Sequence, residues 1–128
     1  MTLQVDVSDM AALYRSADLV IGAGGVGLLE RMASGVPSIT IELAPNQRLQ
    51  LRGAAALGAT LDVGTVSDLS PEGLQKDISR LAGDPALRRA MSKHGRKAVD
   101  GRGAERVATA LLDLARTWIP VKTEGART

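Results

Sequence analysis

The chain has no cysteine and no phenylalanine, and its only aromatic residues are one Trp and one Tyr. Without thiols there is no disulfide, no thiolate nucleophile and no cysteine-based metal site. So few rings also argue against single-stranded nucleic-acid binding, which relies on base stacking, and we expect no nucleic-acid partner. The core must be built from Leu, Ile, Val, Ala and Met, which is typical of helices packed on a parallel sheet.

Long apolar runs and an N-terminal signal segment are missing as well. No apolar stretch approaches the roughly 18 residues that a membrane span needs, so we expect no membrane association and a cytoplasmic location. A length of 128 residues suits one domain, expected over 1–119, with a disordered tail over 120–128. The sole histidine, His94, is expected at the surface, and we assign no catalytic residue, metal site or cofactor.

The chain has only a small excess of positive charge, with a net charge of +2. Most of the excess lies in one basic stretch over 88–102. Such a stretch indicates either a solvated helix face or a patch that faces an anion.

Short apolar runs alternate with helical segments along the chain. We predict strands over 3–7, 17–21, 38–43 and 60–63. Helices are expected over about 9–14, 26–34 and 46–57, then from 70, from 85 and over about 104–118. This order predicts an α/β fold, namely a Rossmann-like parallel sheet of about four strands with flanking helices and three helices at the C-terminal end.

A glycine-rich turn, Gly22-Ala23-Gly24-Gly25-Val26-Gly27, follows a predicted strand and precedes a helix. Glycine permits positive φ and lets a ligand approach the backbone. The start of the helix offers unpaired N–H groups and the positive end of the dipole, which together suit a phosphate. The turn therefore indicates a nucleotide-binding site, although a tight turn without a ligand has the same pattern.

The same six residues fit the G-x-G-x-x-G pattern of dinucleotide-binding proteins. Glu42 ends the next predicted strand, near the position of the acid that holds a ribose in those proteins. An NAD- or FAD-type site is therefore an alternative. Two features count against it, because a strand and helix precede the turn and the helix after it ends early, at Gly35.

Several segments together resemble one family in matching order over roughly 5–115. They are Asp9-Met10-Ala11-Ala12-Leu13, Ala17-Asp18-Leu19-Val20-Ile21-Gly22-Ala23-Gly24-Gly25, Glu30, Gly35-Val36-Pro37, Asn46-Gln47 and Asp100-Gly101-Arg102-Gly103-Ala104-Glu105-Arg106-Val107. The pattern is similar to the C-terminal half of the nucleotide-sugar hydrolase of pseudaminic acid biosynthesis. More distantly it resembles MurG-like glycosyltransferases, which share the two-domain GT-B architecture.

The resemblance implies a role for each matching residue. Gly24 and Gly25, within the turn Gly22–Gly27, would approach the diphosphate of a UDP-sugar-like ligand. Glu30 would hold the ribose hydroxyls, since a carboxylate accepts from two donors, and Asn46 and Gln47 would meet the sugar. Without a ligand, Glu30 would be a solvated helix residue and the Asn–Gln pair would cap its helix.

The sequence departs from the family in two respects. Relatives commonly carry hydroxyl residues between the glycines and the acid, where this chain has Val26-Gly27-Leu28-Leu29. The catalytic N-terminal domain of the family and the first strands of its C-terminal domain have no counterpart here, so we expect no turnover by this chain alone. In that fold the missing strands would lie between 3–7 and 17–21. We therefore expect these two strands to pair directly, or the exposed edges to form a homodimer or exchange strands. A non-catalytic oligomerising domain is the remaining alternative.

Overall fold

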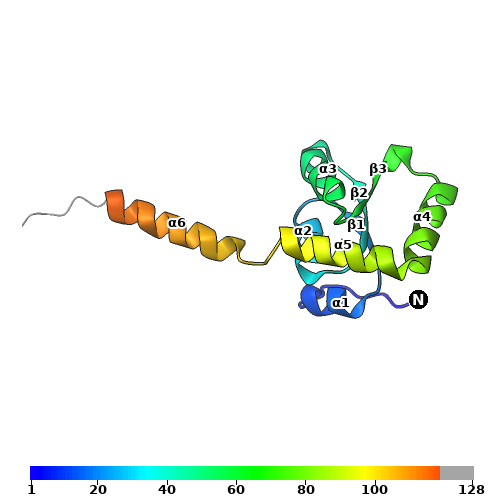
Figure 1. The fold of residues 1–128 in the computed structure, drawn as a ribbon, viewed down its shortest axis with the longest axis horizontal. Helices are drawn as coiled ribbons and strands as arrows, with labels where there is room; N and C mark the ends of the chain where they lie inside the picture. The colour runs from blue at the N-terminus through cyan, green and yellow to red at the C-terminus, as the bar shows by residue number, and fades with distance from the viewer. Residues whose placement is uncertain (119–128) are drawn as a thin grey trace, which may run out of the picture.

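The computed structural model of the chain describes residues 1–118 (Figure 1). The expected disordered tail over 120–128 lies outside the described residues. The helices and strands, in chain order, are α1 (Met10–Ser16), β1 (Val20–Ala23), α2 (Val26–Ser34), β2 (Ser38–Glu42), the 3-10 turn η1 (Pro45–Gln47), α3 (Arg48–Ala56), β3 (Leu61–Thr65), the 3-10 turn η2 (Val66–Asp68), α4 (Pro71–Gly83), α5 (Pro85–Ala98) and α6 (Gly103–Trp118).

The strands form one parallel sheet in the order β1-β2-β3. Ile39 in the central strand pairs with Ile21 of β1 and with Leu61 of β3. The predicted α/β fold with a parallel sheet and flanking helices is confirmed, but within residues 1–118 the sheet has three strands where about four were expected.

The predicted strand over 3–7 was wrong. This segment has no regular structure, and Asp6 takes a φ of 52°, which interrupts an extended run. Alternating apolar residues predict a strand only if a neighbouring strand is available to pair with it. The described residues contain no such pairing, so the expected pair of 3–7 with 17–21 does not form and β1 is an edge of the sheet.

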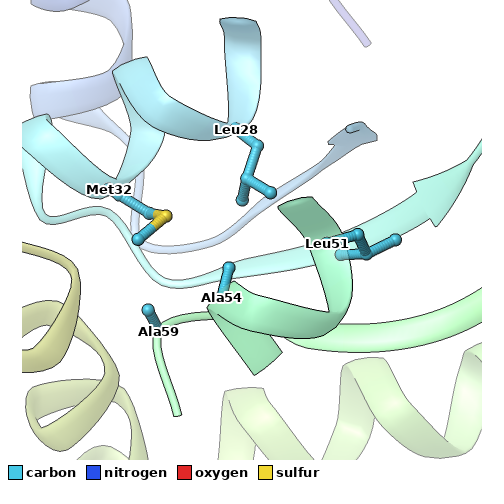
Figure 2. Close-up of a cluster of buried hydrophobic side chains, with 5 residues drawn as sticks. All are labelled: Leu28, Met32, Leu51, Ala54 and Ala59. Atoms are coloured by element: carbon cyan, nitrogen blue, oxygen red, sulfur yellow. The ribbon is translucent and has the colours of Figure 1, made fainter. Parts of the chain in front are cut away.

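Helices cover both faces of the sheet. On one face α2 and α3 enclose an apolar cluster, shown in Figure 2, of Leu28, Met32, Leu51, Ala54 and Ala59. On the other face α4 and α5 bury Leu81 and Met91 against Ile39 of β2. Because side chains alternate along a strand, Ile39 faces α4 and α5, whereas its neighbour Thr40 faces α2.

The two helices over the second face begin as their sequences predict. The Ser70 side chain accepts the Gly73 N–H at the start of α4, and the Asp84 side chain accepts the Leu87 N–H at the start of α5. In both helices proline occupies the first turn, where no N–H is needed. These caps fix where α4 ends and α5 begins.

The last helix, α6, leaves the body of the domain (Figure 1). Every residue from Asp100 to Trp118 is exposed, including the apolar stripe of Val107, Leu111, Leu114 and Trp118. Within the described residues no helix is both long enough and apolar enough to cross a membrane.

Candidate nucleotide-binding turn

The glycine turn lies at the carboxyl end of the sheet, where Gly22 and Ala23 end the edge strand β1, Gly24 and Gly25 connect it to α2, and Val26 and Gly27 begin that helix. The Gly24 N–H donates to the carbonyl of Ile41 on β2, which extends the sheet by one bond beyond β1. Gly25 then reverses the chain with φ 82° and ψ −153°, a conformation that residues other than glycine rarely adopt. The turn therefore requires glycine at 25 for its backbone.

The first turn of α2 offers unpaired donors. Val26 and Gly27 are its first two residues, so their N–H groups have no acceptor inside the helix. The Leu28 N–H is already satisfied, because it donates to the Gly25 carbonyl at 3.1 Å. Val26 itself is 71% exposed, which leaves the end of the helix dipole open to solvent. This arrangement can bind an anionic oxygen.

Two glutamines brace the turn from the neighbouring loop and helix. The Gln50 Oε1 of α3 accepts the Gly25 N–H at 2.9 Å, and the Gln47 Oε1 accepts the Leu43 N–H at 3.0 Å. A Cβ on Gly24 would lie 3.0 Å from the Cβ of Gln47, so this side chain packs directly on the turn. Gln50 was not predicted, although its spacing of three residues from Gln47 puts both on one side of the chain.

Arg31 of α2 lies beneath the turn. A Cβ on Gly22 would stand 2.8 Å from the Arg31 Nη1, and one on Gly27 would stand 3.4 Å from the same atom. These glycines were expected to make room for a ligand, but in the structure their open sides face a protein side chain. The sequence holds no direct sign of this burial, because Arg31 stands beside Glu30 like an ordinary exposed charge. Its spacing of three residues from the buried Leu28 could have placed it on the buried face of the helix.

The Arg31 guanidinium is held by neutral acceptors. Its Nη2 donates to the Ala23 carbonyl at 2.7 Å and to the Thr40 Oγ1 at 3.1 Å. Burial lowers the pKa of Arg31 below its usual value, and the nearby Tyr14 hydroxyl and Glu30 carboxylate oppose that shift. The guanidinium nevertheless keeps its proton, since arginine does not lose it in proteins.

The other predicted ligand residues are open to solvent. Glu30 is exposed on the first turns of α2, and among residues 1–118 it takes part in no hydrogen bond or ion pair. Asn46, in η1, is exposed as well. The structure thus brings Gln47 against the glycine turn and leaves Glu30 and Asn46 available.

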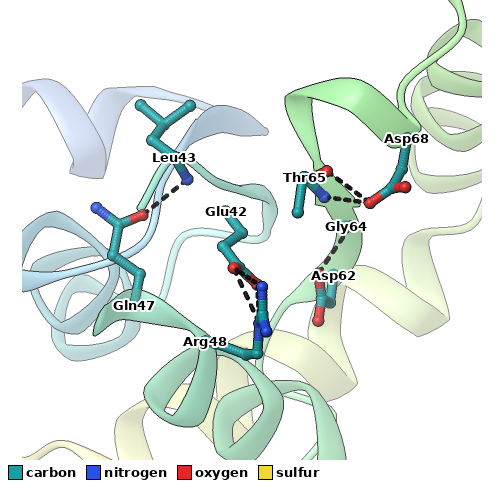
Figure 3. A network of polar contacts seen from close by, with 8 residues as sticks. All are labelled: Glu42, Leu43, Gln47, Arg48, Asp62, Gly64, Thr65 and Asp68. Atoms are coloured by element: carbon teal, nitrogen blue, oxygen red, sulfur yellow. Dashed lines mark hydrogen bonds and ion pairs between the residues drawn. The ribbon is translucent and has the colours of Figure 1, made fainter. Parts of the chain in front are cut away.

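Glu42, the acid of the dinucleotide alternative, is occupied. Its carboxylate accepts from both the Nε and the Nη2 of Arg48, the latter at 2.7 Å, as Figure 3 shows. Arg48 lowers the pKa of Glu42, so the carboxylate stays charged and paired. A ribose would have to compete with this bidentate pair, which counts against a dinucleotide site.

Two cavities lie at opposite ends of the strands. One of about 270 Å³, between the carboxyl ends of β2 and β3, is lined by Glu42, Pro45, Arg48 and Thr65. The other, of about 490 Å³, lies before β1 and β2 and is lined by Asp18, Arg88, Arg89 and Arg96. Ligands of open parallel sheets bind beyond the carboxyl ends of the strands, where the glycine turn also lies.

The basic stretch over 88–102 largely serves the fold. Arg88 donates to the carbonyls of Leu81 and Ala82 at the end of α4, and Arg96 lies against Gly35 at the end of α2. Cations at helix C-termini complement the dipole. His94 is exposed, as predicted.

A parallel sheet whose edge strand runs through a glycine turn into a helix defines a Rossmann-like domain. Residues 3–107 match the glycosyltransferase family 28 C-terminal domain. The chain belongs to this family.

Relatives are found in several bacteria. The chain is 37% identical over 107 residues to the spore coat polysaccharide biosynthesis protein SpsG of Bacillus subtilis, covering 84% of this chain and 32% of the relative. UDP-N-acetylglucosamine--N-acetylmuramyl-(pentapeptide) pyrophosphoryl-undecaprenol N-acetylglucosamine transferases are also similar. That of Mycobacterium avium is 34% identical over 117 residues, covering 88% of this chain and 28% of the relative. That of Xanthomonas axonopodis pv. citri is 38% identical over 113 residues, covering 85% of this chain and 26% of the relative. The chain spans about a third or less of each relative.

Proposed function

We propose that this chain binds the nucleotide diphosphate of a UDP-sugar-like ligand at the glycine turn. The observation that carries the proposal is the start of α2, where the Val26 and Gly27 N–H groups are unpaired and the helix end is open. Such an end attracts phosphate through its donors and its dipole. The names of the transferase relatives, which specify UDP-N-acetylglucosamine, support the same ligand class.

The proposed roles of individual residues follow from chemistry and position. Gly24 and Gly25 approach the diphosphate, and Glu30 accepts from the ribose hydroxyls. Of Asn46 and Gln47, the two residues proposed to meet the sugar, Gln47 lies nearer the glycine turn, because a Cβ on Gly25 would stand 3.8 Å from its Nε2. Asn46 meets the sugar from the exposed side of the same loop.

The proposed activity belongs to a larger enzyme of polysaccharide biosynthesis in the cytoplasm. This domain would hold the nucleotide, while groups supplied by a further domain carry out transfer or hydrolysis of the sugar. The relatives support transfer by name, and the resemblance of the sequence motifs supports hydrolysis. Alone, the domain binds the ligand without turning it over. The apolar stripe on α6 then packs on that further domain.

We also propose that two copies associate through the edge of β1. Parallel pairing with β2 uses the N–H and C=O groups on one side of β1, and the Ile21 side chain is 43% exposed. An uncovered edge strand pairs readily with another chain. Multi-angle light scattering at increasing concentration tests this, and a clean monomer at high concentration would remove the proposal.

Titration with UDP, a UDP-N-acetyl sugar and NAD tests the ligand. We expect UDP and the UDP-sugar to bind, and Glu30→Ala to weaken UDP by about tenfold to a hundredfold through the loss of charged hydrogen bonds. The matched control is Glu72→Ala, which removes an exposed acid from the first turn of α4. NAD binding that depends on Glu42 would instead support the dinucleotide site, and binding of none of the three would favour an oligomerising domain.

A further inference from the structure

Arg31 is a buried cation without an acidic partner. It is 3% exposed, and none of the ion pairs among residues 1–118 includes it. Its Nε is also buried and has no hydrogen-bond partner among these residues. Arginines are almost never fully buried unless they are paired, so this side chain calls for an explanation.

The position of the charge is specific. The guanidinium lies within contact distance of three residues of the glycine turn, with Nη2 bonded to the Ala23 carbonyl at 2.7 Å and Nη1 facing the open sides of Gly22 and Gly27. A Cβ on Gly22 would displace Nη1, whereas one on Gly27 would just touch it. The turn is therefore shaped around a positive charge on the side away from solvent.

Stability alone does not account for this charge. The hydrogen-bond acceptors of Arg31 are neutral, and Glu30, the acid nearest in sequence, is exposed and favours the positive charge without forming an ion pair with it among residues 1–118. A buried ion whose partners are neutral leaves a desolvation cost that an apolar side chain of similar size would avoid. An anion bound on the other side of the turn would offset that cost.

We propose that Arg31 is a positioning residue for the diphosphate, whose charge it stabilises through the glycine turn without touching the ligand. By binding the Ala23 carbonyl, Arg31 also holds this oxygen away from the negative phosphates. The N–H groups of Val26 and Gly27 make the direct contacts. This inference rests on the proposed function and adds to it a buried positive charge that favours binding of the diphosphate.

The test compares UDP with uridine, which has the same base and ribose but no phosphate. NMR chemical-shift titrations of the full chain measure both Kd values, including weak ones, for the wild type, R31M, R31K and R89M. R31M removes the charge and keeps most of the side-chain length. R89M is the matched control, because Arg89 is an exposed arginine on α5 that lines the cavity before β1 and β2, at the other end of the strands from the glycine turn.

If Arg31 acts through its charge, removal of that charge should weaken the binding of UDP and leave the binding of uridine nearly unchanged. R31M should weaken UDP by about ten- to fiftyfold at an effective dielectric constant of about 20, and uridine by less than about twofold. R31K should bind UDP near wild-type affinity at pH 7 and lose that affinity by pH 9, because a buried ammonium readily loses its proton. The wild type should show no such loss between these pH values, and R89M should behave as wild type.

Other results would overturn the inference. Equal weakening of UDP and uridine by R31M would make Arg31 a structural residue only, and unchanged binding of both would remove its role. If circular dichroism shows that R31M is unfolded, R31Q takes its place. An R31K variant whose affinity for UDP is the same at pH 7 and pH 9 would then contradict the proposal. A wild type that binds no UDP would instead defeat the proposed function itself, and this inference with it.

Discussion

The Gly25 N–H donates to the Gln50 Oε1 at 2.9 Å and so links the glycine turn to α3 across 25 positions of sequence. This bond occupies the N–H of Gly25. The donors that we propose for the phosphates are therefore the N–H groups that follow, those of Val26 and Gly27. The shape of the turn depends on α3 as well as on its own sequence.

Removal of the Gln50 acceptor should loosen the turn. In Gln50→Ala the partly buried Gly25 N–H is left without its partner, and the free energy of unfolding should fall by about 1–2 kcal/mol. Urea unfolding measures this change. Gln75→Ala, at an exposed position of α4, is the control and should change stability by less than about 0.5 kcal/mol. Equal effects would show that the bond does not stabilise the fold.

A methyl group on Gly22 should collide with the guanidinium. The Cβ in Gly22→Ala would lie 2.8 Å from the Arg31 Nη1, and the buried side chain must shift. We expect a loss of about 1–3 kcal/mol in unfolding free energy, as for other overpacked sites. Gly53→Ala is the matched control, because nothing lies within 4 Å of its Cβ and α3 should gain up to about 1 kcal/mol. Thermal unfolding measures both variants. A Gly22→Ala variant as stable as the wild type would contradict the close packing of Arg31 against Gly22.

The ion pair between Asp100 and Arg106 should be visible in a pH titration. Arg106 lowers the pKa of Asp100 from 3.8 to about 2 in the folded chain. Because the folded pKa is the lower one, the stabilisation is complete above about pH 4 and is lost as the pH falls through about 2. Carbon NMR of the Asp100 carboxyl measures the midpoint. Arg106→Gln should raise that midpoint towards 3.8, and an unchanged midpoint would show that the pair does not form in solution.

The stripe on α6 should tolerate polar substitution in this chain. Leu111 is 61% exposed, so Leu111→Gln should change the unfolding free energy of the body by less than about 0.5 kcal/mol. Leu28→Ala, which empties a fully buried site under α2, should cost about 2–5 kcal/mol. Urea unfolding compares the two. A large loss in the first variant would mean that α6 folds back onto the domain in solution.

Local signals in the sequence were enough for much of the fold. The strand, glycine turn and short helix around Gly25 follow from residues close together in the chain, and so do the caps at Ser70 and Asp84. The strand over 3–7 was wrong because pairing depends on a partner, which alternation cannot supply. Strand formation is decided by tertiary neighbours more than by intrinsic preference.

The site was less accessible to sequence reasoning than the fold. Glu30, Asn46 and Gln47 were chosen from a resemblance, and their roles remain predictions. Gln50 and Arg31 escaped notice because their partners, Gly25 on one side and Ala23 with Thr40 on the other, are brought to them only by packing. An arginine in a helix is ordinarily solvated, and nothing local distinguished this one.

The close contact of Gly22 and Gly27 with the Arg31 guanidinium has a consequence for protein engineering. The six-residue turn cannot be transferred to another protein by itself. Grafted onto another strand and helix without arginine at the equivalent helical position, it would enclose a void under two glycines. Conversely, a scaffold that supplies the arginine but carries alanine at the position of Gly22 would displace the guanidinium. The three positions therefore have to be transplanted, or substituted, as one unit.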